Sequence, residues 1–202
     1  METNLFLIIV GSALISNFVL TQFLGLCPFF GVSRRSEGAI GMGLAVTFVM
    51  TIAAAVTWAF HTLVLERFDM RFLQTVVFIL IISSVVQFIE VFMKKMVPSI
   101  YSMLGIYLPM ITTNCAVIGV ALINIRDQLT LIQSVLNAVG AGIGFLIAIV
   151  LMAVIREKYE NHPEVPWAFR GFPLALFSAG LMSIAFLGFQ NLAPGLRALM
   201  GR

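Results

Sequence analysis

The sequence predicts an all-α integral membrane protein with six transmembrane helices, arranged as two inverted three-helix repeats with broken helices at the first and fourth spans. Composition is the first observation: 60% of the 202 residues are hydrophobic and only 10% are charged, with a mean hydropathy of +1.05. A soluble domain carries about 25% charged residues. The second observation is that the charges bracket six long uncharged stretches, and the third is a motif shared by the first and fourth of them.

The six uncharged stretches hold 161 of the 202 residues. They cover residues 3–33, 38–65, 72–89, 96–125, 128–155 and 171–196. Because roughly 20 apolar residues cross the hydrocarbon core, each stretch can form one span, the third only just. The longest connection, from Arg156 to Arg170, is too short for a soluble domain. We therefore expect a single membrane domain over residues 1–202, which excludes an appended nucleotide, flavin or nucleic-acid domain.

The basic residues give no sign of a nucleic-acid partner. The net charge is +3, but the longest basic runs are the pairs Arg34-Arg35 and Lys94-Lys95. The first ten residues contain no Lys or Arg, and the apolar stretch that follows is too long for a signal peptide. We expect no cleavable leader, and the lipid bilayer as the main surroundings of the chain.

The first and fourth stretches are too long for straight spans. With 31 and 30 residues, they would extend about 45 Å as continuous helices, against a hydrocarbon core of about 30 Å. Tilt is one explanation. Both stretches, however, contain glycine and proline in their interiors, at Pro28 and Pro109. A broken helix inside the bundle fits better, because non-helical backbone at membrane depth must be surrounded by protein or a cavity.

The second and fifth stretches each begin with three closely spaced glycines. They are Gly38, Gly41 and Gly43 in one stretch, and Gly140, Gly142 and Gly144 in the other. Small residues at this spacing let membrane helices approach closely, so we interpret them as helix-packing positions rather than ligand contacts. The third and sixth stretches have ordinary membrane-helix composition.

The two halves of the chain resemble each other. Cys27 and Cys115, the two cysteines of the chain, each begin the pattern Cys-x-x-x-Gly-Val, and a glycine-rich stretch follows each pattern. We therefore divide the chain into a repeat over about residues 3–94 and another over about residues 95–196. Because three spans are an odd number, the second repeat must be inverted, and such repeats characteristically build a site near the bilayer midplane.

Charge counts predict the orientation. Seven Lys and Arg residues fall on one side of the six spans: Arg34, Arg35, Lys94, Lys95, Arg156, Lys158 and Arg170. Five fall on the other side: Arg67, Arg71, Arg126, Arg197 and Arg202. The positive-inside rule places the side with seven in the cytoplasm and both termini outside.

Three interpretations of the two cysteines stand open from the residues alone. Free cysteine usually behaves as a small buried apolar residue. A disulfide is a second possibility, although a membrane-buried pair has no evident need of one. Metal ligation is the third: a [2Fe–2S] cluster requires four cysteines, so two more would have to come from another protein chain.

Three segments around these cysteines resemble a known family. They read LGLCPFFGVS at residues 24–33, GMGLAVTFV at residues 41–49 and YLPMITTNCAV at residues 107–117. They are similar to the A subunits of the Rnf (also called Rsx) ion-translocating electron-transport complexes, which are related to the E and D subunits of the sodium-pumping NADH:quinone oxidoreductase. The resemblance extends over essentially the whole chain.

The resemblance implies a six-helix inverted-repeat protein that pairs with the paralogous E subunit of the Rnf complex. The two proteins would share an intramembrane [2Fe–2S] cluster, with Cys27 and Cys115 as the two ligands from this chain. The remaining partners would be the B, C, D and G subunits. The complex would transfer electrons between ferredoxin and NAD, coupled to Na⁺ or H⁺ transport. The chain would then be a multi-pass component of a redox-driven translocase (enzyme class 7) in the bacterial inner membrane, with periplasmic termini and no activity alone.

Other residues have expected supporting roles. A midplane cluster would give electrons the intermediate stop that a core of about 30 Å requires. Gly25, Gly31 and Gly119 would let backbone N–H groups approach its sulfurs. Asn114 would either assist there or cap a helix at the break. No catalytic residue is predicted.

Two ionisable residues within the uncharged stretches or next to them are expected at the membrane interface rather than in a functional site. Glu90 lies four positions before Lys94, so we expect an i,i+4 pair at the membrane interface, with an ion-pathway role as the alternative. His61 is expected at the interface as well.

Two alternative functions remain from the residues. A secondary transporter also has inverted repeats with broken helices, but the centres of these spans offer only Asn, Gln, Ser and Thr as polar groups. A purely structural membrane scaffold is the other alternative.

Overall fold

The computed structural model of the chain describes residues 9, 11–15, 17–65, 74–96, 110–111, 113–160 and 171–190. Within those ranges all regular elements are helical. In chain order they are η1 (Gly11–Ile15), α2 (Leu26–Val32), α3 (Ser36–Phe60), η2 (His61–Leu65), α5 (Gln74–Met96), α8 (Cys115–Arg126), α9 (Leu131–Glu160) and α10 (Phe172–Gln190). The η elements are single π-helical turns.

The all-helical membrane class is confirmed. In the part of the chain that the structure describes, three segments are long and apolar enough to cross a bilayer: Ser36–Val64, Gln74–Val91 and Leu131–Tyr159. Two shorter apolar helices are Cys115–Arg126 and Phe172–Gly188. The exposed surface of α5 and α10 carries large apolar side chains, such as Phe88, Phe177 and Ile184, which suits a lipid or protein environment rather than water.

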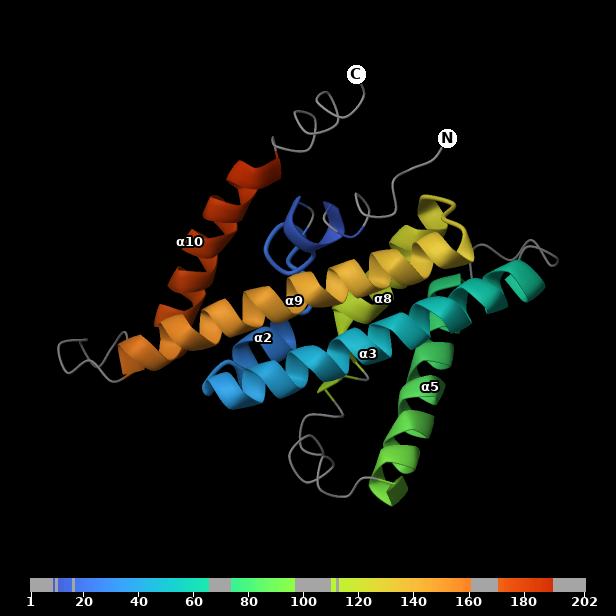
Figure 1. The fold of residues 1–202 in the computed structure, drawn as a ribbon, viewed down its shortest axis with the longest axis horizontal. Coiled ribbons are helices and arrows are strands. Elements are labelled where there is room, and N and C mark those ends of the chain that lie inside the picture. The colour runs from blue at the N-terminus through green and yellow to red at the C-terminus, as the bar shows by residue number, and fades with distance from the viewer. Residues whose placement is uncertain are drawn as a thin grey trace.

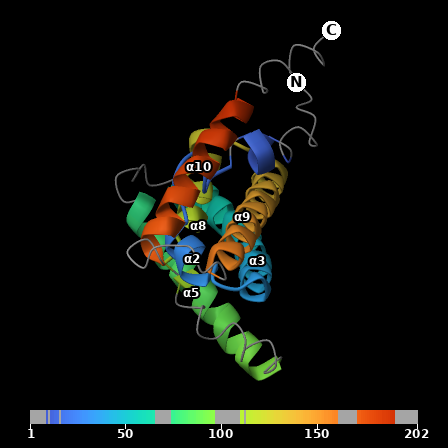
Figure 2. The ribbon, with the colours of Figure 1, turned by 90° about the vertical axis from the view of Figure 1, so that its left-hand side faces the viewer.

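Helices α3 and α9 form the centre of the fold and run antiparallel (Figures 1 and 2). At one end the Trp58 indole donates to the Leu129 carbonyl at 2.9 Å, just before α9 begins. At the other end Arg156 of α9 reaches Phe30, just before α3 begins. Between these ends the glycines of each helix meet side chains of the other: Gly43 faces Leu146, and Gly142 faces Thr47. This confirms the packing role predicted for these two glycines.

The first of the two expected helix breaks lies between η1 and α2. Residues 17–25 are non-helical, and Phe23 and Gly25 have positive φ values of 57° and 83°. Pro28 does not itself break the helix, because it is the third residue of α2, where a helix lacks internal partners for its N–H groups. The break therefore precedes the proline.

The second break ends at Asn114. Residues 113–114 are non-helical and α8 begins at Cys115. Pro109, the breaker expected in this stretch, lies outside the described residues, as do the arginines at 67, 71, 170, 197 and 202.

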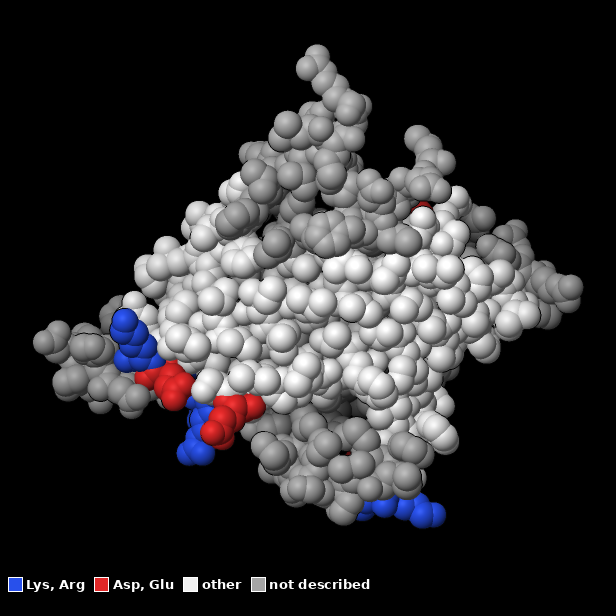
Figure 3. Space-filling view, in the orientation of Figure 1, with Lys and Arg blue, Asp and Glu red and all other residues white. Residues whose placement is uncertain are grey.

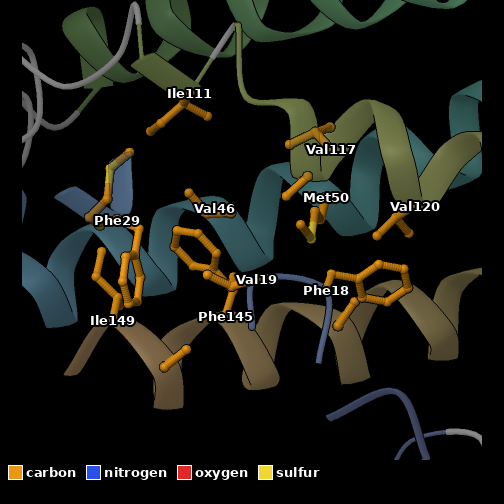
Figure 4. Close-up of a cluster of buried hydrophobic side chains, with 14 of the residues drawn as sticks. Phe18, Val19, Phe29, Val46, Met50, Ile111, Val117, Val120, Phe145 and Ile149 are labelled. Atoms are coloured by element: carbon orange, nitrogen blue, oxygen red, sulfur yellow. The ribbon is translucent and has the colours of Figure 1, made fainter. Parts of the chain in front are cut away.

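The core collects side chains from both halves of the chain. Phe18 and Val19 from the first break belong to one buried cluster with Phe29 of α2, Val46 and Met50 of α3, and residues of α8 and α9 (Figure 4). Phe29 and Val46 are completely buried. The part of the first break around Phe18 and Val19 is thus buried in protein, as non-helical backbone at membrane depth requires.

Charged side chains gather at the end where α3 begins and α9 ends, and the length of the α3–α9 pair is uncharged on the face in Figure 3. Arg34, Arg35 and Lys158 of the predicted cytoplasmic group are exposed at this end. Arg156 differs from the prediction. It was expected at the start of a connection, but α9 continues to Glu160 and buries it.

Candidate metal centre

Cys27 is the second residue of α2. Gly25 precedes the helix as its N-cap, in a left-handed conformation that glycine adopts without steric cost. The first helical hydrogen bond runs from Phe29 N to Gly25 O at 3.3 Å. Cys27 is exposed and its thiol is free. In the chain alone, the interpretation of Cys27 as a small buried core residue is therefore wrong.

Cys115 is the first residue of α8. Asn114 caps this helix: its side-chain Oδ1 accepts a hydrogen bond from Ala116 N at 3.0 Å. The helix dipole at such a position favours negative charge, as a thiolate carries. The thiol of Cys115 is free and half-buried, so neither cysteine forms the disulfide that was considered.

The two cysteine-bearing helix starts pack directly against each other. A Cβ placed on Gly25 would lie 3.1 Å from Asn114 Oδ1 and 3.1 Å from Ala116 Cβ. A side chain at this position would force Asn114 or Ala116 to shift by a few tenths of an ångström, so glycine favours the close approach. Segments 88 residues apart in the sequence, each carrying one cysteine, are thereby held at one place.

Gly31 and Gly119 contribute to the same contact. A Cβ on Gly31 would lie 2.8 Å from Met110 Cε, and a Cβ on Gly119 would lie 2.6 Å from Leu24 Cδ1. Each of these glycines therefore contacts a side chain that shortly precedes the cysteine of the other half. This gives both residues a packing role between the two breaks, and their expected approach to a cluster stays a prediction.

Asn17 is a key residue that the sequence patterns did not indicate. Its side chain is completely buried, and its Oδ1 accepts from Val19 N at 3.1 Å and Leu20 N at 3.4 Å. Its Nδ2 donates to Gly144 O of α9 at 2.8 Å. Asn17 thus replaces the helical hydrogen bonds of the first break and fixes the break to α9. The available signal was an asparagine inside a long apolar stretch, ten residues before a cysteine.

Helix α10 donates a hydrogen bond to the backbone of the first break, where the hydroxyl of Ser183 donates to Leu20 O at 2.6 Å. Within the break itself, Leu24 N donates to Phe18 O at 3.0 Å. Backbone groups that a break would leave unpaired in hydrocarbon are therefore bonded within the protein.

Arg156 holds the other end of α2. Its guanidinium donates to Phe30 O at 2.9 Å and to Ser33 Oγ at 3.2 Å. A cation at the C-terminal end of a helix meets carbonyl groups that have no helical donor. The short helix carrying Cys27 is thus fixed at its start by Gly25 and at its end by Arg156.

The donor set fits half of a four-cysteine centre. Among the described residues, no three His, Cys, Asp or Glu side chains group together as a metal site would require. The two cysteines nevertheless lie at adjacent helix starts, and Cys27 is exposed. Beside them, the Nδ2 of Asn114 is buried without a hydrogen-bond acceptor.

Glu90 and His61 lie away from this centre. Glu90 is half-buried in α5 and Lys94 is exposed one turn later, and their pairing stays a prediction. His61 starts η2 at the end of α3, as its expected place near a span end requires, and its ring packs edge-on against Phe78 with centroids 6.4 Å apart.

Comparisons with known proteins identify the family. Residues 5–193 match the model of the family described as "Rnf-Nqr subunit, membrane protein". The chain is 52% identical over 192 residues to the A subunit of the Na(+)-translocating ferredoxin:NAD(+) oxidoreductase complex of Acetobacterium woodii, covering 95% of this chain and 100% of that one. It is 51% identical over 192 residues to the A subunit of the ion-translocating oxidoreductase complex of Syntrophotalea carbinolica, covering 95% and 99%. Identity to the protein of the same name in Cereibacter sphaeroides is 51% over 191 residues, covering 95% and 98%. The chain therefore belongs to the Rnf-Nqr family of membrane subunits.

Proposed function

We propose that this chain is the A-type membrane subunit of an Rnf complex that couples electron transfer to ion translocation, and that Cys27 and Cys115 are two of the four ligands of a [2Fe–2S] cluster. Relatives covering nearly the whole chain carry the name of this component. The observation that carries the cluster is the direct packing of the two cysteine-bearing helix starts through Gly25.

Two cysteines on one chain leave two ligands to be supplied by a partner. Cys27 is exposed in the single chain, on a helix held at both ends, and this accessibility is what a shared centre requires. A second protein of the same family, inverted in the membrane, would present an equivalent pair. We assign this place to the E subunit, with the B, C, D and G subunits completing the complex.

The order of elements supports two inverted repeats. In the first half, a break leads into a short helix with a cysteine (α2), a long helix (α3) and a third helix (α5). In the second half, a break leads into a short helix with a cysteine (α8), a long helix (α9) and a third helix (α10). The facing pairs Gly43 with Leu146 and Gly142 with Thr47 are equally spaced along antiparallel helices, as a two-fold relation in the membrane plane would give.

A bound [2Fe–2S] cluster would accept and release one electron, providing a stop between carriers on the two sides of a hydrocarbon core of about 30 Å. This chain would hold the two thiolates, exclude water with the core around Phe29 and Phe145, and keep α2 in place through Arg156. In the cell this would take place in the bacterial inner membrane, with both termini periplasmic. The chain alone would catalyse no reaction, and all 202 residues would form one membrane domain.

Cysteine replacement in the whole complex tests the proposal. Cys27→Ser and Cys115→Ser should each remove one [2Fe–2S] signal from the electron paramagnetic resonance (EPR) spectrum of the reduced complex. Iron and acid-labile sulfide should fall by the content of one cluster per complex. Gln22→Ser is the matched control, because Gln22 is exposed in the same break and is no ligand. Retention of the signal in both cysteine variants would show that neither cysteine is a cluster ligand and would favour a purely structural role for the chain.

A further inference from the structure

One buried polar atom beside the cysteines has no partner. Among the described residues, the buried side-chain atoms without a hydrogen bond are Asn114 Nδ2 and Ser134 Oγ. The Asn114 side chain is completely buried. Leaving a buried amide donor unpaired destabilises a protein, and hydrocarbon offers no water to compensate. A polar group kept at this cost next to a candidate ligand requires an acceptor.

The orientation of the amide is determined by the cap. Oδ1 is the acceptor for Ala116 N, so Nδ2 is the opposite end of the same planar group. The backbone of the residue is also held, because Asn114 N donates to Ile111 O at 3.2 Å. The two roles considered for Asn114, cap and cluster neighbour, therefore do not compete: one uses the oxygen and the other the nitrogen.

The amide stands between the two cysteine-bearing helix starts. Asn114 immediately precedes Cys115, and its Oδ1 lies 3.1 Å from the position a Cβ would take on Gly25, two residues before Cys27. We propose that Asn114 Nδ2 donates a hydrogen bond to a sulfur of the bound cluster, either a cysteine thiolate or a bridging sulfide, and thereby raises its reduction potential. This inference rests on the cluster proposed above.

The expected sign follows from charge. Reduction adds one electron to the cluster and breaks no bond, so negative charge on the sulfurs increases. An N–H donor interacts more strongly with the reduced form and raises the potential. Asn114 acts here as a positioning and tuning residue, since its sequence neighbour rather than its own side chain would bind iron.

Asn114→Ser separates the nitrogen from the cap. A serine hydroxyl accepts the Ala116 N–H well at an N-cap, but it removes the amide nitrogen. In the purified complex we expect unchanged iron and sulfide, a lower midpoint potential in an EPR-monitored titration, and loss of the amide-nitrogen coupling in pulsed EPR. Asn114→Asp, which keeps shape and cap, should lower the potential as well. Asn124→Ser is the matched control, because Asn124 is equally buried in α8 but is bonded to Asn137 at 2.7 Å.

A measurement on the unmodified complex makes the test independent of the variants. Growth with ¹⁵N-labelled asparagine should change the nitrogen coupling of this cluster. An unchanged coupling overturns the inference, and so does a potential that Asn114→Ser leaves where it was. If no cluster signal depends on Cys27 and Cys115, the result instead contradicts the proposed function, which is ligation of a cluster by these two cysteines.

Discussion

Gly25 combines two constraints at one residue. Its φ of 83° is a conformation that costs other residues roughly 1–2 kcal/mol, and a Cβ would lie 3.1 Å from Asn114 Oδ1 and from Ala116 Cβ. Gly171 has an equally positive φ of 94°, but a Cβ there would have no neighbour within 4 Å. Comparing Gly25 with Gly171 therefore separates the cost of backbone strain from the cost of a close contact with neighbouring side chains.

We predict that Gly25→Ala destabilises the chain by about 2–5 kcal/mol, the sum of strain and overpacking, while Gly171→Ala costs the strain alone, about 1–2 kcal/mol. Gly25→Ala should also lower the iron content, because it forces the two cysteine-bearing helix starts apart. The measurements are the apparent melting temperature and the iron content of the purified complex. Equal effects of the two variants would show that the contact with Asn114 and Ala116 is unimportant.

At the scale of the element, the sequence predicted which helices break but not where. Length together with glycine and proline pointed to the right two stretches. The position of the first break depends instead on Asn17, whose amide bonds Val19, Leu20 and Gly144. The bond to Gly144 crosses 127 positions of sequence, so no local pattern could contain it. The same holds for Gly25, whose neighbours Asn114 and Ala116 belong to the other half of the chain.

The burial of Arg156 was missed for a related reason. A charge at the end of an apolar run indicates the end of a span, and hydropathy cannot reveal an acceptor elsewhere in the fold. The acceptors are Phe30 O and Ser33 Oγ at the end of α2. With such partners a guanidinium is retained inside the protein, and α9 continues past it to Glu160.

We predict that Arg156→Gln lowers stability by about 1.5–3 kcal/mol, the usual contribution of a charged hydrogen bond in a buried site. Lys158→Gln makes the same change of charge on the same helix, but Lys158 is exposed, so its cost should stay within about 0.5 kcal/mol. Thermal unfolding of the two complexes provides the comparison. A loss for Lys158→Gln as large as that for Arg156→Gln would attribute the effect to net charge.

The α3–α9 contact allows a second comparison between glycines. A Cβ on Gly142 would lie 2.6 Å from Thr47 Cγ2 and 2.8 Å from Thr47 Cα, whereas a Cβ on Gly41 would meet nothing within 4 Å. Gly142→Ala should therefore cost about 1–3 kcal/mol through overpacking, and Gly41→Ala should be neutral or stabilising by up to about 1 kcal/mol. The yield and melting temperature of the folded complex measure both. A neutral Gly142→Ala would mean that the two long helices can separate freely.

For the whole molecule, composition was sufficient to predict the membrane class, because six uncharged stretches leave no other way to bury so much apolar surface. The relation between the halves was visible only as a six-residue pattern around each cysteine. In the structure the glycine of each pattern contacts a side chain that lies shortly before the cysteine of the other half: Gly31 meets Met110 and Gly119 meets Leu24. The glycines of the shared pattern thus also take part in the packing between the two halves of the chain.

The predicted orientation in the membrane rests on a small difference in positive charge: seven Lys and Arg residues lie on one side of the six spans and five on the other. Because positive charge is retained in the cytoplasm, a phosphatase reporter fused after Arg202 or Asp127 should be active outside, and a green fluorescent reporter fused after Lys158 should fluoresce inside. The double change Arg34→Gln and Arg35→Gln leaves five positive residues on each side, so the bias disappears and both reporters should show mixed orientation. Both arginines are exposed, so this change should act through topology rather than through lost packing. Phosphatase activity after Lys158 in the unmodified chain would reverse the orientation and place the charged end of α3 and α9 outside.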